Sequence, residues 1–180
     1  MDKNIFTVPN QLTFLRLGFL PFFIIAIRYN RYDWALVLLI AAGLSDALDG
    51  LLARRLNQKT QLGMLLDPIA DKLLLSSSFL MLALKGKIGW WLAILVLGRD
   101  VLLLTACAVI LLVVGYTAFP PSLFGKLSTA FQILLVLIVI IGALTPNPTL
   151  HDLRVLLVYL VAGFTIFSGF HYSIVVARKL

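Results

Sequence analysis

Aspartates in apolar surroundings are the residues of this sequence that could carry chemistry. All eight acidic residues are aspartate, and five lie in or at the edge of apolar segments: Asp46, Asp49, Asp67, Asp71 and Asp100. A carboxylate without a partner at bilayer depth costs at least ~2.5 kcal/mol. Four of the five form two pairs, Asp46 with Asp49 and Asp67 with Asp71. Bound cations are therefore needed to offset their negative charge.

The spacing of these two pairs matches the helical repeat. One group with this spacing is Asp46, Asp49, Gly50 and Ala53. The other group is Gly63, Asp67 and Asp71. Each group shares one helix face, and the short link over 54–62 makes the two helices adjacent and antiparallel. Two divalent cations would neutralise the four carboxylates, as in two-metal phosphoryl-transfer sites. Oxygen-only ligands favour Mg²⁺, Mn²⁺ or Ca²⁺ over Zn²⁺.

Small and basic residues accompany the aspartates. Gly50 and Ala53 leave room for a bulky ligand and for close helix approach, and Gly63 does the same on the facing helix. Arg54, one residue past the aspartate face, can bind a diphosphate through its guanidinium fork. The pattern therefore predicts a site for a metal-bound diphosphate.

Long apolar segments must position these residues. The 180-residue chain is 61% hydrophobic and 13% charged, with a mean hydropathy of +1.03, whereas soluble domains carry about 25% charged residues. Six apolar segments run roughly over 12–28, 33–53, 64–84, 89–114, 122–143 and 153–176, each near the ~20 residues of a membrane-spanning helix. They are continuously apolar, which excludes the alternation of barrel strands. We expect an all-α integral membrane protein with six transmembrane helices in a single domain, 1–180.

The net charge of +7 does not indicate nucleic-acid binding, because the basic residues stand in short loops between apolar segments. With the N-terminus in the cytoplasm, the cytoplasmic side carries Lys3, Arg54, Arg55, Lys59, Lys126, Arg178 and Lys179. The opposite side carries Arg28, Arg31, Lys85, Lys87 and Arg154. This weak excess favours cytoplasmic N- and C-termini and places the aspartates at the cytoplasmic side.

The aspartates and their neighbours also resemble a known family. The pattern Asp46-x2-Asp49-Gly50-x2-Ala53-Arg54-x8-Gly63-x3-Asp67-x3-Asp71 matches the signature of the CDP-alcohol phosphatidyltransferases without departure. The opening Val8-Pro9-Asn10-Gln11-Leu12-Thr13-x2-Arg16 and the later segment 125–132 resemble, more loosely, the branch that makes phosphatidylglycerophosphate or cardiolipin.

The resemblance implies a bundle of six helices and specific residue roles. Asp46, Asp49, Asp67 and Asp71 would bind two Mg²⁺ or Mn²⁺ ions, with Asp67 and Asp71 at the reacting centre and Asp71 as general base. The CDP group of CDP-diacylglycerol would be bound by Asp49, Gly50, Ala53, Arg54, Gly63, Asn10 and Thr13. The family also implies an active site at the cytoplasmic side, with a bacterial inner membrane as the expected location and a homodimer as a possible assembly.

The acceptor alcohol is left open between two glycerol derivatives. Glycerol 3-phosphate is the lead, and its phosphate would need cations among Arg99, Lys126, Arg16 and Arg55. Phosphatidylglycerol is the alternative, because the Arg99-Asp100 pair and His171-Tyr172 resemble cardiolipin synthases. Arg99 and Asp100 could instead form an internal salt bridge that orients helices, and His171 could be structural.

Two other classes of protein compete with the transferase. Intramembrane aspartates also mark ion paths, so a small cation transporter is the alternative from a different class. Its carboxylates would be spaced across the membrane, whereas these cluster at one edge. A purely structural membrane adaptor would leave four buried acids without a reason.

Overall fold

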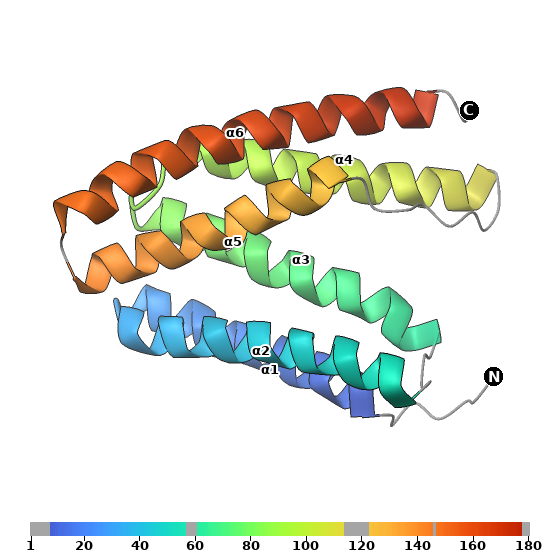
Figure 1. Cartoon of the computed structure of the whole chain (residues 1–180), viewed down its shortest axis with the longest axis horizontal. Helices are drawn as coiled ribbons and strands as arrows, with labels where there is room; N and C mark the ends of the chain where they lie inside the picture. Colours follow the sequence, from blue (N-terminus) through green and yellow to red (C-terminus); the bar gives the residue numbers. More distant parts are fainter. Residues whose placement is uncertain (1–7, 57–60, 114–122, 146, 178–180) are drawn as a thin grey trace. The chain divides into compact units, whose positions relative to one another are not determined.

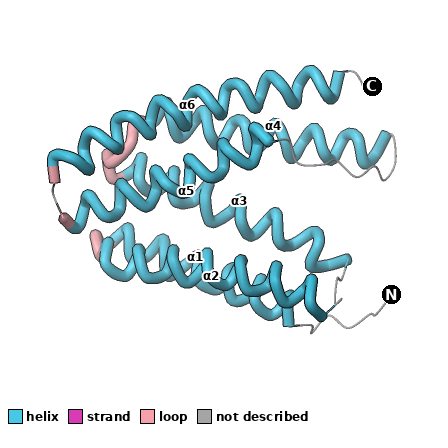
Figure 2. Tube along the Cα trace, viewed as in Figure 1, coloured by secondary structure: helices cyan, strands magenta, loops and turns pink. Residues whose placement is uncertain are grey.

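The computed structural model describes the backbone over residues 8–56, 61–113, 123–145 and 147–177, and the side chains over 14–45, 70, 72–105, 125–145 and 147–170. This part of the chain is all-helical (Figure 1 and Figure 2). The helices are α1 (Val8–Arg28), α2 (Tyr32–Leu56), α3 (Gln61–Leu84), α4 (Trp90–Val113), α5 (Leu123–Leu144) and α6 (Pro148–Ala177). The predicted all-α architecture with six helices is confirmed.

The helices divide into two compact units, Met1–Leu82 and Ala83–Leu180. The first unit contains α1, α2 and all but the last residues of α3, and therefore all four paired aspartates. The second unit contains α4, α5 and α6 together with Arg99 and Asp100.

In the first unit, α1 and α2 contact each other as a hairpin. Asn30 ends α1 in the left-handed conformation, with φ at 58°. The Asn30 N–H donates to the Ile27 carbonyl at 3.0 Å, and the Arg31 N–H donates to the Ala26 carbonyl at 2.8 Å. This pair of bonds is a Schellman cap, and asparagine tolerates the positive φ that it requires. The chain therefore reverses within three residues and starts α2 at Tyr32.

The turn between α1 and α2 also holds an exposed ion pair. Arg31 Nη2 donates to Asp33 Oδ2 at 2.9 Å, and Arg31 Nε donates to Asp33 Oδ1 at 3.2 Å. The hydrogen bond to Asp33 raises the pKa of Arg31 above its ordinary value. Asp33 therefore offsets part of the positive charge expected on this side of the membrane.

In the second unit, α6 contacts both α4 and α5. Each helix contributes fully buried apolar side chains, including Leu92 and Val96 of α4, Leu135 and Ile140 of α5, and Val161 of α6. Because α6 is common to both contacts, side chains from all three helices can be brought together along it.

The start of α6 lies at Pro148, about five residues before the start of the apolar segment at 153. Asn147 Oδ1 accepts a hydrogen bond from the Thr149 N–H at 2.9 Å, which is an N-cap. Pro148 occupies the first helical position, where its missing N–H costs nothing. Asn147 and Pro148, which follow the apolar segment 122–143, thus begin α6.

Many large apolar side chains are exposed, as expected of helices in lipid. Phe22 is 62% exposed, Tyr159 69% and Phe170 68%. Among the described residues, Gly125–Leu144 and Pro148–Phe170 are long and apolar enough to cross a membrane, with mean hydropathies of 2.6 and 1.9. Only 33% and 28% of these two segments are buried, unlike the core helix of a soluble protein. The described residues therefore have the character of an integral membrane protein, with two candidate spans among them.

Candidate functional site

The paired aspartates lie at similar distances from the ends of two consecutive helices. Asp46 and Asp49 stand about two to three turns before the end of α2, and Asp67 and Asp71 stand about two to three turns after the start of α3. Both stretches have helical backbone, as the spacing predicts. The side chains of the four aspartates lie outside those that the structure describes, so their metal contacts stay a prediction.

For the other residues predicted to bind the CDP group, the structure likewise describes the backbone and not the side chains. Their backbone is helical, with Asn10 and Thr13 on α1, Gly50, Ala53 and Arg54 on α2, and Gly63 on α3. Arg55 on α2 and His171 on α6 also have helical backbone. All these side chains lie outside the described set, so the structure leaves their roles untested.

Arg16 is the predicted acceptor residue that the structure describes in the first unit. It lies on α1 and is only 1% exposed. At about 1.5 Å of rise per residue, Arg16 and Ser45 both lie roughly 20 Å from the turn at Asn30. Asp46 follows Ser45 in α2, so Arg16 is a buried cation at the level of the hairpin where the aspartate motif begins. A cation at this level can help to balance carboxylates or bind a phosphate.

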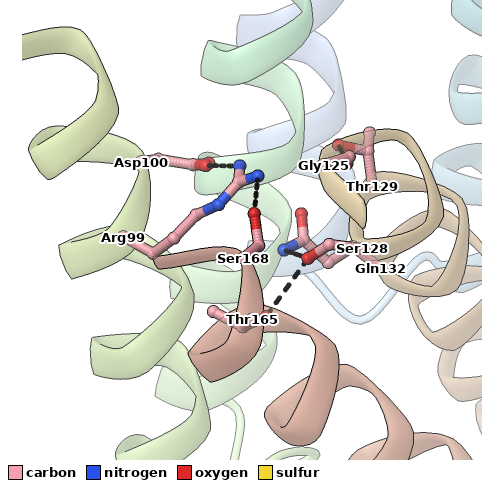
Figure 3. Close-up of polar contacts among 8 residues, drawn as sticks. All are labelled: Arg99, Asp100, Gly125, Ser128, Thr129, Gln132, Thr165 and Ser168. Carbon is pink, nitrogen blue, oxygen red and sulfur yellow. Dashed lines mark hydrogen bonds and ion pairs between the residues drawn. The ribbon is translucent and has the colours of Figure 1, made fainter. Parts of the chain in front are cut away.

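In the second unit, a buried ion pair lies on α4 and is linked to α6 by a hydrogen bond. Arg99 Nη1 donates to Asp100 Oδ1 at 2.8 Å, with both side chains nearly inaccessible to solvent. Arg99 Nη2 donates to Ser168 Oγ of α6 at 2.9 Å (Figure 3). The same guanidinium therefore bonds a carboxylate on its own helix and a hydroxyl on the neighbouring helix. The predicted pair is thus present as a salt bridge within α4, and the hydrogen bond from Arg99 to Ser168 links it to α6.

A second buried group joins α5 to α6 beside it. Gln132 Nε2 donates to Ser128 Oγ at 3.3 Å, and Ser128 Oγ lies 3.4 Å from Thr165 Oγ1. Thr165 and Ser168 are one turn apart on α6, so the two polar groups are adjacent along that helix (Figure 3). Together the residues Arg99, Asp100, Ser128, Gln132, Thr165 and Ser168 form what is here called the polar cluster.

The polar cluster borders a cavity of about 300 Å³. Its lining comes from α4 and α6: Leu95, Gly98, Arg99, Leu102, Thr165, Ile166, Gly169 and Phe170. Arg99 and Thr165 supply the polar part, and the rest is apolar. Arg99 Nε makes no hydrogen bond to the described part of the chain, so the guanidinium keeps one donor for a further partner. The cavity can accommodate a molecule with one anionic group and an apolar remainder.

Sequence reasoning singled out Arg99 and Lys126 in this unit but assigned no role to Ser168, Thr165 or Gln132. Lys126 is exposed in the first turn of α5, whereas Arg99 is buried. Ser128 and Gln132 are four residues apart, and Thr165 and Ser168 are three apart. That helical spacing of polar residues in apolar helices is the signal that could have revealed them.

Fold and residues define a helical membrane protein with paired aspartates on two helices and a separate buried cation. The family model described as CDP-alcohol phosphatidyltransferase matches residues 6–167. This chain therefore belongs to the CDP-alcohol phosphatidyltransferase family, whose enzymes use divalent metal ions.

Several curated proteins are similar to this chain. A "Probable phosphatidylglycerophosphate synthase" of Mycobacterium tuberculosis is 32% identical over 183 residues, covering 98% of this chain and 83% of that protein. A "Cardiolipin synthase (CMP-forming)" of Streptomyces coelicolor is 37% identical over 143 residues, covering 73% and 66%. Mycobacterial relatives provisionally named cardiolipin synthases are 35% identical over 129 residues, and the chain spans 61% of their length.

Proposed function

We propose that this protein transfers a phosphatidyl group from CDP-diacylglycerol to a glycerol-derived alcohol and releases CMP. The observation that carries the proposal is the complete aspartate motif on consecutive helices α2 and α3, within a family match over residues 6–167. That match runs through both compact units, which supports one functional domain over 1–180.

The donor set of the motif suits a hard divalent cation. Asp46, Asp49, Asp67 and Asp71 would hold two ions, Mg²⁺ or Mn²⁺, because carboxylate oxygens are the ligands these metals prefer. When bound, the ions would neutralise charge on the diphosphate and so make CMP a better leaving group. Removal of divalent ions with EDTA should abolish CMP release, and Mg²⁺ should restore it.

The remaining steps belong to side chains of the protein. Asp71 would accept the proton of the acceptor hydroxyl as its oxygen attacks the phosphorus. A new phosphate–oxygen bond forms, the bond to CMP breaks, and CMP leaves. Asn10, Thr13, Gly50, Ala53, Arg54 and Gly63 would bind and orient the CDP group.

Glycerol 3-phosphate is the lead acceptor, and its phosphate would be bound by cations among Arg99, Lys126, Arg16 and Arg55. Arg16 and Arg99 are both buried, at 1% and 7% exposure. A buried guanidinium binds a phosphate strongly, through short charge-assisted hydrogen bonds. A relative named as a phosphatidylglycerophosphate synthase covers nearly the whole chain, which supports this choice.

Phosphatidylglycerol is a second acceptor that one observation favours. The cavity beside Arg99 has an apolar lining apart from Arg99 and Thr165. Such a lining suits a phosphodiester that carries acyl chains better than it suits a small, strongly hydrated phosphate. Relatives named as cardiolipin synthases point the same way.

The test is CMP release by the purified protein with CDP-diacylglycerol and Mg²⁺, supplied with either acceptor. Turnover with glycerol 3-phosphate alone would support the lead acceptor, and turnover with phosphatidylglycerol alone would replace it. Metal-dependent ion flux without CMP formation would overturn the proposal in favour of a cation transporter.

The proposed location is a bacterial inner membrane, with six spans and the active site at the cytoplasmic side. The excess of basic residues on the side of the N-terminus supports this orientation. A homodimer is the proposed assembly, and the mass of the purified protein measured by light scattering would test it.

A further inference from the structure

A second cavity lies at the turn between α5 and α6. Its volume is about 390 Å³. The lining residues come from the end of α5, the start of α6 and the segment before α4: Lys87, Ile138, Val139, Gly142, Ala143, Asn147, Pro148, Leu150, His151 and Arg154. All of them belong to the second unit.

One side of this cavity is cationic. Lys87 and Arg154 both line it, and both are half-buried. The described acids of the second unit are Asp100, which is bonded to Arg99, and Asp152. Neither lines the cavity. The cavity therefore presents at least two positive charges and His151, with no carboxylate in its lining.

The N-terminal end of α6 adds to the positive charge of the cavity. The cavity includes the first residues of a helix of 30 residues, whose N-terminal N–H groups carry partial positive charge. Asn147 Oδ1 accepts from the Thr149 N–H, and the Asn147 carbonyl accepts from the His151 N–H at 3.2 Å. The helix start that borders the cavity is thus fixed in place by its own cap.

The other side of the cavity is apolar. Ile138, Val139, Gly142 and Ala143 of α5 line it together with Leu150 of α6. The cavity also lies where the candidate span Gly125–Leu144 ends and the candidate span Pro148–Phe170 begins. It therefore combines cations with an apolar wall at the edge of a membrane.

The cavity is distant from the polar cluster of the same unit. Along α5, Gly142 lies roughly 20 Å from Ser128, and along α6, His151 lies roughly 25 Å from Ser168. The cavity and the polar cluster are thus at opposite ends of the α5–α6 hairpin. If the hairpin spans the membrane, they belong to opposite leaflets.

We propose that this cavity binds the phosphate-bearing headgroup of an anionic membrane lipid. Lys87 and Arg154 contact the phosphate, and the apolar wall of α5 contacts the glycerol and the first acyl carbons. The proposal rests on the cavity and its charges, and it stands whether or not the protein is a transferase. The bound lipid would act as a structural or regulatory ligand.

Lipid binding is best measured by native mass spectrometry of the whole protein in neutral detergent. Dioleoylphosphatidic acid is a suitable probe, because it has no hydroxyl group that could act as an acceptor. Dioleoylphosphatidylcholine controls for acyl chains without net charge, and inorganic phosphate controls for a soluble anion. We expect saturable binding of phosphatidic acid that exceeds the binding of both controls.

Charge variants test the residues named. Lys87→Gln and Arg154→Gln should each weaken the binding of phosphatidic acid about fivefold, since a basic residue at a membrane surface contributes about 1 kcal/mol toward an anionic lipid. Lys85→Gln is the matched control, because Lys85 carries the same charge two residues away and does not line the cavity. It should leave the affinity unchanged.

A shape variant tests the cavity without altering charge. A Cβ atom at Gly142 would meet nothing closer than Leu150 Cβ at 4.0 Å. Gly142→Ala should therefore keep lipid binding, whereas Gly142→Phe should fill the cavity and abolish it. If Gly142→Phe does not fold, the charge variants alone decide.

Three results would overturn the proposal. Equal weakening by Lys85→Gln and Lys87→Gln would show general surface attraction. Equal affinity for phosphatidylcholine would show binding by acyl chains alone. Inorganic phosphate binding as tightly as phosphatidic acid would make the cavity a site for a soluble anion.

Discussion

Arg99 combines contacts to two helices with a place in the lining of a cavity. Its guanidinium bonds Asp100 on the same helix and Ser168 on α6, and it also borders the cavity of about 300 Å³. A buried ion pair is weak evidence for stability in itself, but removal of one partner strands the other charge. The same contacts therefore serve packing and hold Arg99 beside the cavity in which the proposed acceptor would bind.

Loss of the Asp100 charge should destabilise the protein. Asp100→Asn leaves a buried guanidinium without its counterion, which costs about 3–5 kcal/mol. Thermal unfolding in detergent, followed by circular dichroism, would measure the fall in Tm. Asp33→Asn is the matched control, because the Arg31–Asp33 pair is exposed, with side chains 60% and 52% accessible. An equal fall in both variants would contradict the role of burial.

The contact with Ser168 separates positioning from stability. Ser168→Ala removes one hydrogen bond to Arg99 and keeps the ion pair with Asp100. If Arg99 binds the acceptor, KM for the acceptor should rise by a factor of about ten, as for a charged hydrogen bond worth 1.5 kcal/mol, while KM for CDP-diacylglycerol stays the same. An unchanged acceptor KM with a lower Tm would assign Ser168 to packing alone.

The aspartate motif gives the sharpest prediction about catalysis. Asp71→Asn removes the proposed base and a metal ligand but keeps the size of the side chain, so CMP release should fall by at least about 10²–10⁴-fold. Asp152→Asn, an exposed residue of the first turns of α6, should keep full activity. Circular dichroism would verify that both variants remain helical. Retained activity in Asp71→Asn would refute its role as base.

At the scale of elements, the helices were predictable and the contacts between them were not. Apolar segments of about 20 residues predicted all six helices, because only helices satisfy the backbone in lipid. The segment from 153 placed the start of α6 too late, because the Asn147 cap extends the helix into polar sequence. Ser168 bonds Arg99 from 69 residues away, and nothing local indicates which helices pack together.

In the candidate site too, features within one helix were predictable and contacts between helices were not. The aspartate motif is contained in two consecutive helices, so spacing alone was enough to predict a site for two metal ions, and the side-chain contacts of that site stay a prediction. Arg99 and Asp100 were visible because charges are rare in apolar segments. Ser128, Gln132 and Thr165 are neutral, and their meeting depends on how α5 packs on α6.

The turn between α1 and α2 offers a test at this scale. Asn30 has φ at 58°, a conformation that costs residues with a Cβ atom about 1–2 kcal/mol. Asn30→Gly should keep or slightly raise Tm, whereas Asn30→Val should lower it. Equal Tm values for both variants would argue against a Schellman cap at the end of α1.

At the scale of the whole molecule, the two candidate spans of the second unit define a hairpin that can be oriented by experiment. The proposed topology puts the α5–α6 turn outside the cytoplasm and the start of α5 inside. Thr149 and Lys126 are exposed at these two ends. Each can therefore report one side of the membrane.

Cysteine labelling would test this orientation. In a Cys107→Ala background, which removes the one native cysteine, Thr149→Cys should react with an impermeant maleimide in intact cells. Lys126→Cys should react only after permeabilisation. The reverse pattern would invert the topology and place the proposed active site outside the cytoplasm.

The pairing of Arg99 with its immediate neighbour has a consequence for biogenesis. During synthesis, α4 emerges from the ribosome well before α6, so Ser168 is not yet available when α4 meets the lipid. Because the counterion of Arg99 is Asp100, the helix carries its own neutralising charge into the bilayer. The segment that enters the translocon therefore carries one positive and one negative charge that cancel, and α4 need not wait for a later helix to supply the counterion.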